Sequence, residues 1–138
     1  MQAPGRPEAS SLAGRDPALE PGTDLSRPTW NGAQAGFRVY RDWLAIINAH
    51  RVTRGLPVFI TSTNTFTTDT NVRPARNYPD GWLTQALAEI NVEPQIVALC
   101  WFMDDLPDAQ WDEFSLSKQI DGLSNAATEF EALLQTTP

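Results

Sequence analysis

Five polar residues follow two short apolar segments of this chain, and their hydroxyl, amide and carboxylate groups can form hydrogen bonds with a ligand. They are Ser62, Thr63, Asn64, Asp104 and Asp105. A carboxylate here could also take part in proton transfer. The same residue types are common in turns, in solvated loops and at helix caps, where they bond the local backbone. Both roles stay open. Asn64 is the favoured ligand contact after the first apolar segment, and Asp104 is favoured after the second.

Ser62 does not fit the nucleophile of a serine hydrolase. No Gly-x-Ser-x-Gly sequence surrounds it, and the only histidine, His50, is expected at the end of a helix that leads to the opposite end of a strand. One histidine and one cysteine make no metal-ligand cluster of the usual spacing, and no glycine-rich phosphate loop is present. We expect no metal and no cofactor. Cys100, between Leu99 and Trp101, is predicted to be an inert core thiol.

The composition argues against two classes of partner. The formal net charge is -7 and the ten Lys and Arg residues are dispersed, whereas nucleic-acid binding needs a clustered basic face. The longest apolar run, residues 96–103, is far shorter than the roughly 20 residues that span a bilayer. We therefore expect a soluble protein with neither nucleic acid nor membrane as partner. Residues 1–11 show no secretory signal, and the compartment stays open.

The chain divides into two parts. Residues 1–35 are rich in proline and glycine and poor in large apolar side chains, which predicts a loop or disordered tail. Residues 36–138 carry the folded domain. Within it, apolar residues spaced three and four apart predict a helix from residue 36 to about residue 52. Its expected buried stripe is Phe37, Tyr40, Trp43, Leu44 and Ile47.

Two strands and two further helices are expected next. Residues 56–61 and residues 95–102 are apolar runs typical of strands buried on both faces of a parallel sheet. Long loops follow the strands at residues 62–78 and 103–119. The helix between the strands is expected to begin at Pro79 or Asp80. A last helix follows the second long loop and ends the domain. Their predicted buried stripes are Leu83, Ala86, Leu87 and Ile90, and then Leu123, Ala127, Phe130 and Leu134.

This alternation of helices and strands predicts an α/β fold with right-handed crossovers. Fully apolar strands need neighbours on both edges and layers on both faces, because their backbone groups and side chains would otherwise be exposed. We therefore expect the sheet to be incomplete, with further strands supplied from elsewhere.

Four segments resemble the end of a glycoside-hydrolase (β/α)8 barrel. They are FRVYRDW at 37–43, LPVFITSTN at 56–64, GWL at 81–83 and ALCWF at 98–102. The resemblance covers residues 36–135 and implies that residues 36–138 are the C-terminal part of such a barrel. The two strands would then belong to the last two βα units of a TIM-barrel-type parallel sheet whose other strands are missing.

The resemblance also bears on catalysis. In retaining glycosidases of this type the seventh strand commonly ends in a nucleophilic glutamate, in a pattern like Ile-Thr-Glu, whereas this chain has Ile60, Thr61 and Ser62. A retaining mechanism needs two carboxyl groups about 5 Å apart, and a serine replaces neither. The usual acid would come from the fourth strand, which this chain lacks, so the chain alone is expected to be inactive and its catalytic residues are unknown. Either an unusual carboxylate serves or the domain has lost hydrolysis.

By the same resemblance, four residues are expected to contact a carbohydrate or glycoside. They are Trp101, Asn64, Asp104 and Ser62. The flat indole of Trp101 would match the apolar face of a pyranose, and the polar groups would bond sugar hydroxyls. Trp101 could equally be a core tryptophan that closes the barrel.

Three functions remain open from the sequence. The chain could be part of a glycoside-hydrolase-like protein, which accounts for its unpaired strands. It could be a non-catalytic carbohydrate-binding or scaffold domain, which accounts for Ser62 in place of glutamate. It could also be a small α/β interaction module that self-associates through its strand edges.

Overall fold

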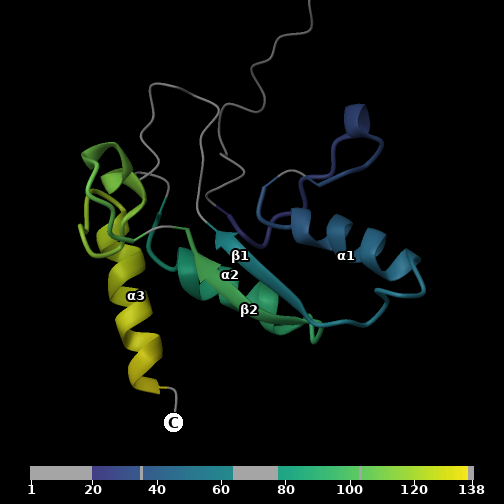
Figure 1. Cartoon of the computed structure of the whole chain (residues 1–138). Helices are drawn as coiled ribbons and strands as arrows, with labels where there is room; N and C mark the ends of the chain where they lie inside the picture. Colours follow the sequence, from purple (N-terminus) through teal and green to yellow (C-terminus); the bar gives the residue numbers. More distant parts are fainter. Residues whose placement is uncertain (1–19, 35, 64–77, 103, 137–138) are drawn as a thin grey trace, which may run out of the picture.

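The computed structural model describes residues 20–34, 36–63, 78–102 and 104–136. In these ranges the chain alternates helices and strands in the order α1, β1, α2, β2, α3 (Figure 1). Their bounds are α1 Val39–Ala49, β1 Val58–Thr63, α2 Trp82–Asn91, β2 Ile96–Trp101 and α3 Leu123–Thr136. Short 3-10 helices, η2 Pro28–Trp30 and η4 Ala109–Phe114, precede α1 and α3. The mixed α/β class is confirmed.

β1 and β2 pair in parallel and form a two-stranded sheet. The first pair joins Val58 to Ile96, and the N–H of Val58 donates to the carbonyl of Gln95 at 2.8 Å. β1 begins two residues later than predicted. The preceding residue, Pro57, has no N–H to donate to the ladder, so regular pairing starts after it.

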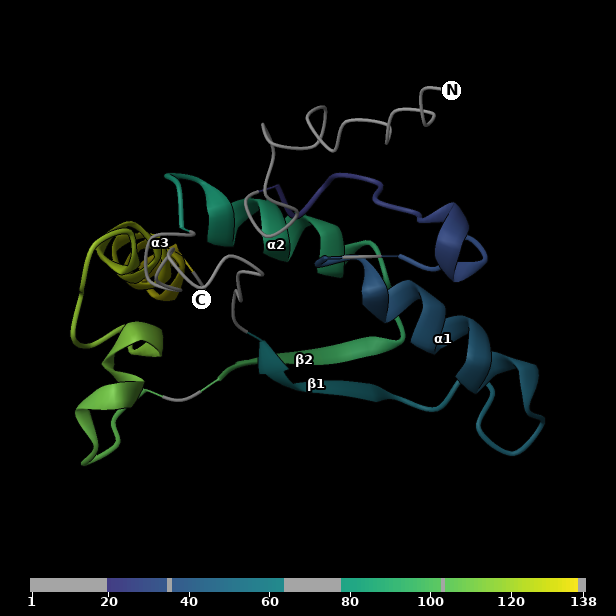
Figure 2. The same cartoon turned by 90° about the horizontal axis from the view of Figure 1, so that it is seen from above.

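One face of this sheet is covered and the other is open. α1 and α2 lie on the same face, and no described element lies on the other (Figure 2). On the open face Phe59 is 60% exposed and Val97 is 54% exposed. The prediction of strands buried on both faces is therefore wrong for the described chain, because its helices form a layer on one side only.

Cys100 also lies on the open face. Its neighbours in β2, Leu99 and Trp101, pack into the two hydrophobic clusters on the helix side. Side chains alternate along a strand, so the intervening Cys100 points away from the helices, and it is exposed. The prediction of a core thiol is wrong.

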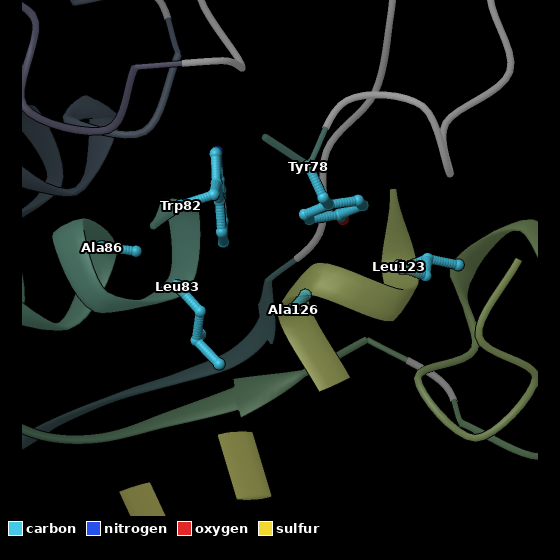
Figure 3. Packing of buried hydrophobic residues seen from close by; sticks show 6 residues of the cluster. All are labelled: Tyr78, Trp82, Leu83, Ala86, Leu123 and Ala126. Carbon is cyan, nitrogen blue, oxygen red and sulfur yellow. The ribbon is translucent and has the colours of Figure 1, made fainter. Parts of the chain in front are cut away.

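The first hydrophobic cluster joins α2, α3 and the residue Tyr78 before α2 (Figure 3). Its buried members are Tyr78, Trp82, Leu83, Ala86, Leu123 and Ala126. The rings of Tyr78 and Trp82 meet edge to face, with 5.2 Å between their centroids. The cluster fixes the first half of α3 against the start of α2.

The second hydrophobic cluster joins α1, α2 and β2. Its buried members are Tyr40, Leu44, Ile90 and Ile96. Tyr40 and Leu44 are buried as predicted, but Trp43 is 61% exposed. At about 100° per residue, Trp43 lies about 60° around the helix from Tyr40, on the side away from Leu44. The apolar sector of α1 is thus wider than the surface that α1 packs against the sheet.

α3 is buried over its first half only. Leu123 and Ala127 are buried as predicted, whereas Phe130 is 45% exposed and Leu134 is 62% exposed. Figure 1 shows the second half of α3 projecting toward the carboxyl end of the chain. The predicted stripe is continuous, but its last two members stay largely exposed, while the neighbouring Leu133 still packs against the first hydrophobic cluster.

The segment before α1 is tied to that helix. Ser26 and Gln34 form a single antiparallel bridge, and the side chain of Gln34 donates to Asp24 at 2.7 Å. The backbone N–H of Gln34 donates to the carboxylate of Asp42, in the first turn of α1, at 2.6 Å. Residues 20–34, which belong to the predicted tail, therefore fold back onto the start of α1.

Candidate functional site

Two predicted site residues lie at the carboxyl ends of the two strands. Because the strands are parallel, Ser62 in β1 and Trp101 in β2 lie at the same end of the sheet. Thr63 pairs with Trp101, and its carbonyl accepts a 2.9 Å hydrogen bond from the N–H of Phe102. Ser62 is exposed at this end. The fourth predicted residue, Asn64, lies outside the described residues.

Trp101 is partly buried and has a clear packing role. Its indole N–H donates to the carbonyl of Phe114 at 2.7 Å. Its ring lies 5.2 Å from that of Tyr78 and 6.4 Å from that of Trp82, measured between centroids. The indole thus links β2 to the first hydrophobic cluster and to the loop before α3. A sugar would meet only the part of the ring that stays exposed.

Asp104 shapes the loop that follows β2. Its Oδ1 accepts a 2.9 Å hydrogen bond from the backbone N–H of Ser117 and a 3.3 Å bond from the hydroxyl of Ser115. The neighbouring Asp105 forms an exposed ion pair with Lys118, with 3.7 Å between the charged atoms. The local structural role considered for Asp104 is therefore present. Asp104 is nevertheless exposed, so a ligand can reach its carboxylate.

Aromatic residues of the same loop pack together beside the strand end. The ring centroids of Phe102 and Phe114 are 5.7 Å apart, and Trp111 lies 6.3 Å from Phe102 and 6.0 Å from Phe114. Phe114 also accepts the hydrogen bond from Trp101. The loop is thereby held against the carboxyl end of β2, next to Asp104.

His50 and Ser62 do not form a catalytic pair in this arrangement. His50 is the C-cap of α1 and precedes β1, while Ser62 lies near the opposite end of that strand. Within the described ranges, no three His, Cys, Asp or Glu side chains are grouped so that they could hold a metal ion. No helix in these ranges has the length and apolar character needed to cross a membrane.

α1 also carries an exposed apolar stripe, of which only Trp43 was predicted, and as a buried residue. Val39, Trp43 and Ile46 are all exposed, and their spacing of four and three places them along one side of the helix. That spacing was a visible signal. Trp43 also fits the spacing of the buried stripe, because it lies three residues after Tyr40, and Tyr40 and Leu44 suffice to bury the helix.

Comparisons of this chain with protein-family models, with curated proteins and with solved structures gave no match.

Proposed function

We propose that this chain is a carbohydrate-binding unit of a barrel-type α/β fold, equivalent to the C-terminal βα units of such a barrel, with the sugar bound at the carboxyl ends of β1 and β2. The observation that carries the proposal is that Ser62 and Trp101 lie at the same end of a parallel sheet, with Asp104 in the loop that follows β2. Ligands of parallel α/β folds bind at this end of the strands. Hydroxyl, carboxylate and indole groups together suit a pyranose.

The arrangement of layers supports a barrel-type sheet as the finer form of the fold. In such a barrel the helices surround the strands and apolar side chains fill the interior. Here α1 and α2 cover one face of the sheet (Figure 2). Phe59 and Val97 on the other face are large, apolar and exposed, as expected of side chains that would fill the interior.

The proposed activity is binding without hydrolysis by this chain alone. The resemblance places a nucleophilic glutamate where the chain has Ser62. A neutral hydroxyl without an adjacent base is a poor substitute for a carboxylate at an anomeric carbon. Hydrolysis would need carboxyl groups beyond those assigned to the site.

Isothermal titration with cellohexaose and with xylohexaose tests this proposal. We expect saturable binding of at least one of the two, weakened about tenfold by Trp101→Phe and by Ser62→Ala, because each variant removes a contact with the sugar. Trp30→Phe is the matched control. Trp30 is an exposed tryptophan outside the site, stacked under Arg27 at 4.4 Å from the ring centroid.

Two outcomes would overturn the carbohydrate proposal. One is the absence of binding of either hexasaccharide by the unmodified chain. The other is an affinity that falls equally in Trp101→Phe and Trp30→Phe. Thermal unfolding of each variant separates a lost contact from a lost fold, because Trp101 also packs against Tyr78.

A further inference from the structure

Two helices carry exposed apolar stripes that the described chain leaves uncovered. On α1, Val39 is 42% exposed and Ile46 is 54% exposed, on either side of the more exposed Trp43. On α3 the stripe consists of Phe130 and Leu134, one turn apart. Exposed apolar stripes of this kind are candidate contacts with another protein surface.

The two stripes belong to opposite flanks of the molecule. Both views place α2 between α1 and α3 (Figures 1 and 2). The sheet also has an unpaired edge on each side. In the described chain β1 and β2 pair only with each other, so each strand keeps one free edge. Each flank exposes one helix stripe and one strand edge, and the two flanks are different. Such flanks can form a head-to-tail contact, in which one flank of a copy meets the other flank of the next copy.

The charges of the two flanks are opposite. Residues 38–54, which contain α1, have four arginines against one aspartate, and two of these arginines, Arg38 and Arg41, already pair with Glu89 of α2. Residues 121–136, which contain α3, have two glutamates, one aspartate and no lysine or arginine. Arg51 and Arg54 on the first flank are exposed, as is Glu131 on the second. Like charges disfavour a contact of α1 with α1 or of α3 with α3, and opposite charges favour a mixed contact.

We infer that a second copy of this chain docks head to tail, with the α1 stripe of one copy against the α3 stripe of the next. The same contact brings the free edge of β1 toward the free edge of β2 in the neighbouring copy. Pairing there would extend the parallel sheet and satisfy backbone groups that are otherwise open. This contact is independent of the proposed sugar site, which lies at the strand ends.

Sedimentation velocity of two variants, alone and mixed, tests the contact. Trp43→Glu places an acid in the α1 stripe and Phe130→Glu places one in the α3 stripe, and both positions are exposed, so the fold should be retained. We expect concentration-dependent association of the unmodified chain, weakened about tenfold or more in each variant. An equimolar mixture should form dimers, because one intact α3 stripe and one intact α1 stripe then remain.

Three results would overturn this inference. They are an unmodified chain that stays monomeric at every concentration, variants that associate as well as the unmodified chain, and a mixture that associates no better than either variant. Trp30→Glu is the control, since Trp30 lies outside both stripes, and its association should be unchanged. Circular dichroism verifies that each variant is folded, and hexasaccharide titration of the variants shows whether the sugar site is affected.

Discussion

Arg38 and Glu89 form the ion pair that joins the start of α1 to α2. The guanidinium Nε and Nη2 each lie 2.9 Å from a different carboxylate oxygen, and Arg41 adds a third contact at 3.2 Å. The side chains of the pair are mostly shielded from solvent. The hydrogen bonds from Arg38 hold the pKa of Glu89 below its ordinary value of 4.5, with the charges of Arg38 and Arg41 acting in the same direction.

This pair predicts a contribution to stability that depends on pH. The pKa of Glu89 is lower in the folded chain, so its contribution is fully present above pH 4.5 and is lost as the pH falls through the folded pKa. We expect Glu89→Gln to lower the free energy of unfolding by about 1 kcal/mol near neutral pH and by less in acid. Urea unfolding of both proteins across this pH range measures the difference.

A difference that stays constant into acid would show that Glu89 stabilises the fold by packing and not by charge. Glu131→Gln is a suitable control. Glu131 is an exposed carboxylate on α3, so its replacement should change the stability of the isolated chain little at any pH.

The sequence predicted where Trp101 lies but not what it contacts. A strand end follows from a local apolar run, and Trp101 is the last residue of β2. Its hydrogen bond to Phe114, 13 residues away, depends on how a long loop returns to the sheet. Neither periodicity nor residue type predicts the path of this loop. The sequence alone therefore could not decide whether Trp101 is a sugar-binding residue or a core tryptophan.

At the level of elements, helix periodicity predicted more than strand composition did. The buried positions Tyr40 and Leu44 of α1 and Ala86 and Ile90 of α2 follow from spacings of three and four. The exposure of a strand face cannot be predicted in this way, because it depends on which other element covers that face. The apolar runs of both strands gave no sign that one face of the sheet is open, since a run buried on both faces in a larger sheet has the same composition.

The start of α2 is capped by a residue of α3. The carboxylate of Glu129 accepts hydrogen bonds from the N–H of Gly81 at 2.7 Å, the N–H of Thr84 at 2.8 Å and the hydroxyl of Thr84 at 2.9 Å. A negative charge is also favourable at this end of a helix dipole. This contact between distant segments fixes where α2 begins, at Trp82, after the predicted Pro79 or Asp80.

Removing this cap should weaken the packing of α3 against α2. We expect Glu129→Ala to lower the free energy of unfolding by about 1–2 kcal/mol, because free N–H groups at a helix start lose their acceptor. Glu129→Gln should cost less, since the amide oxygen still accepts hydrogen bonds. Thermal unfolding of the two variants compares them, and equal stability of Glu129→Ala and the unmodified chain would show that the cap contributes nothing.

On the scale of the whole molecule, one arrangement would account for the exposed helix stripes, the free strand edges and the open face of the sheet. Head-to-tail contacts through α1 and α3 would place the free strand edges side by side, as one parallel sheet. If this sheet curved toward its open face, Phe59 and Val97 would lie on the inside. About eight strands enclose an interior that side chains can fill, which corresponds to about four copies of a two-stranded chain.

Cys100 reports on whether the open face becomes an interior. It is the only cysteine of the chain and is exposed on that face. Maleimide should label it readily in monomeric Trp43→Glu and about tenfold or more slowly in the assembled unmodified chain, because a closed interior excludes the reagent. Mass spectrometry of samples quenched over time gives both rates. If both proteins are labelled at equal rates although sedimentation shows that the unmodified chain associates, the copies join through their helices while the sheet stays open.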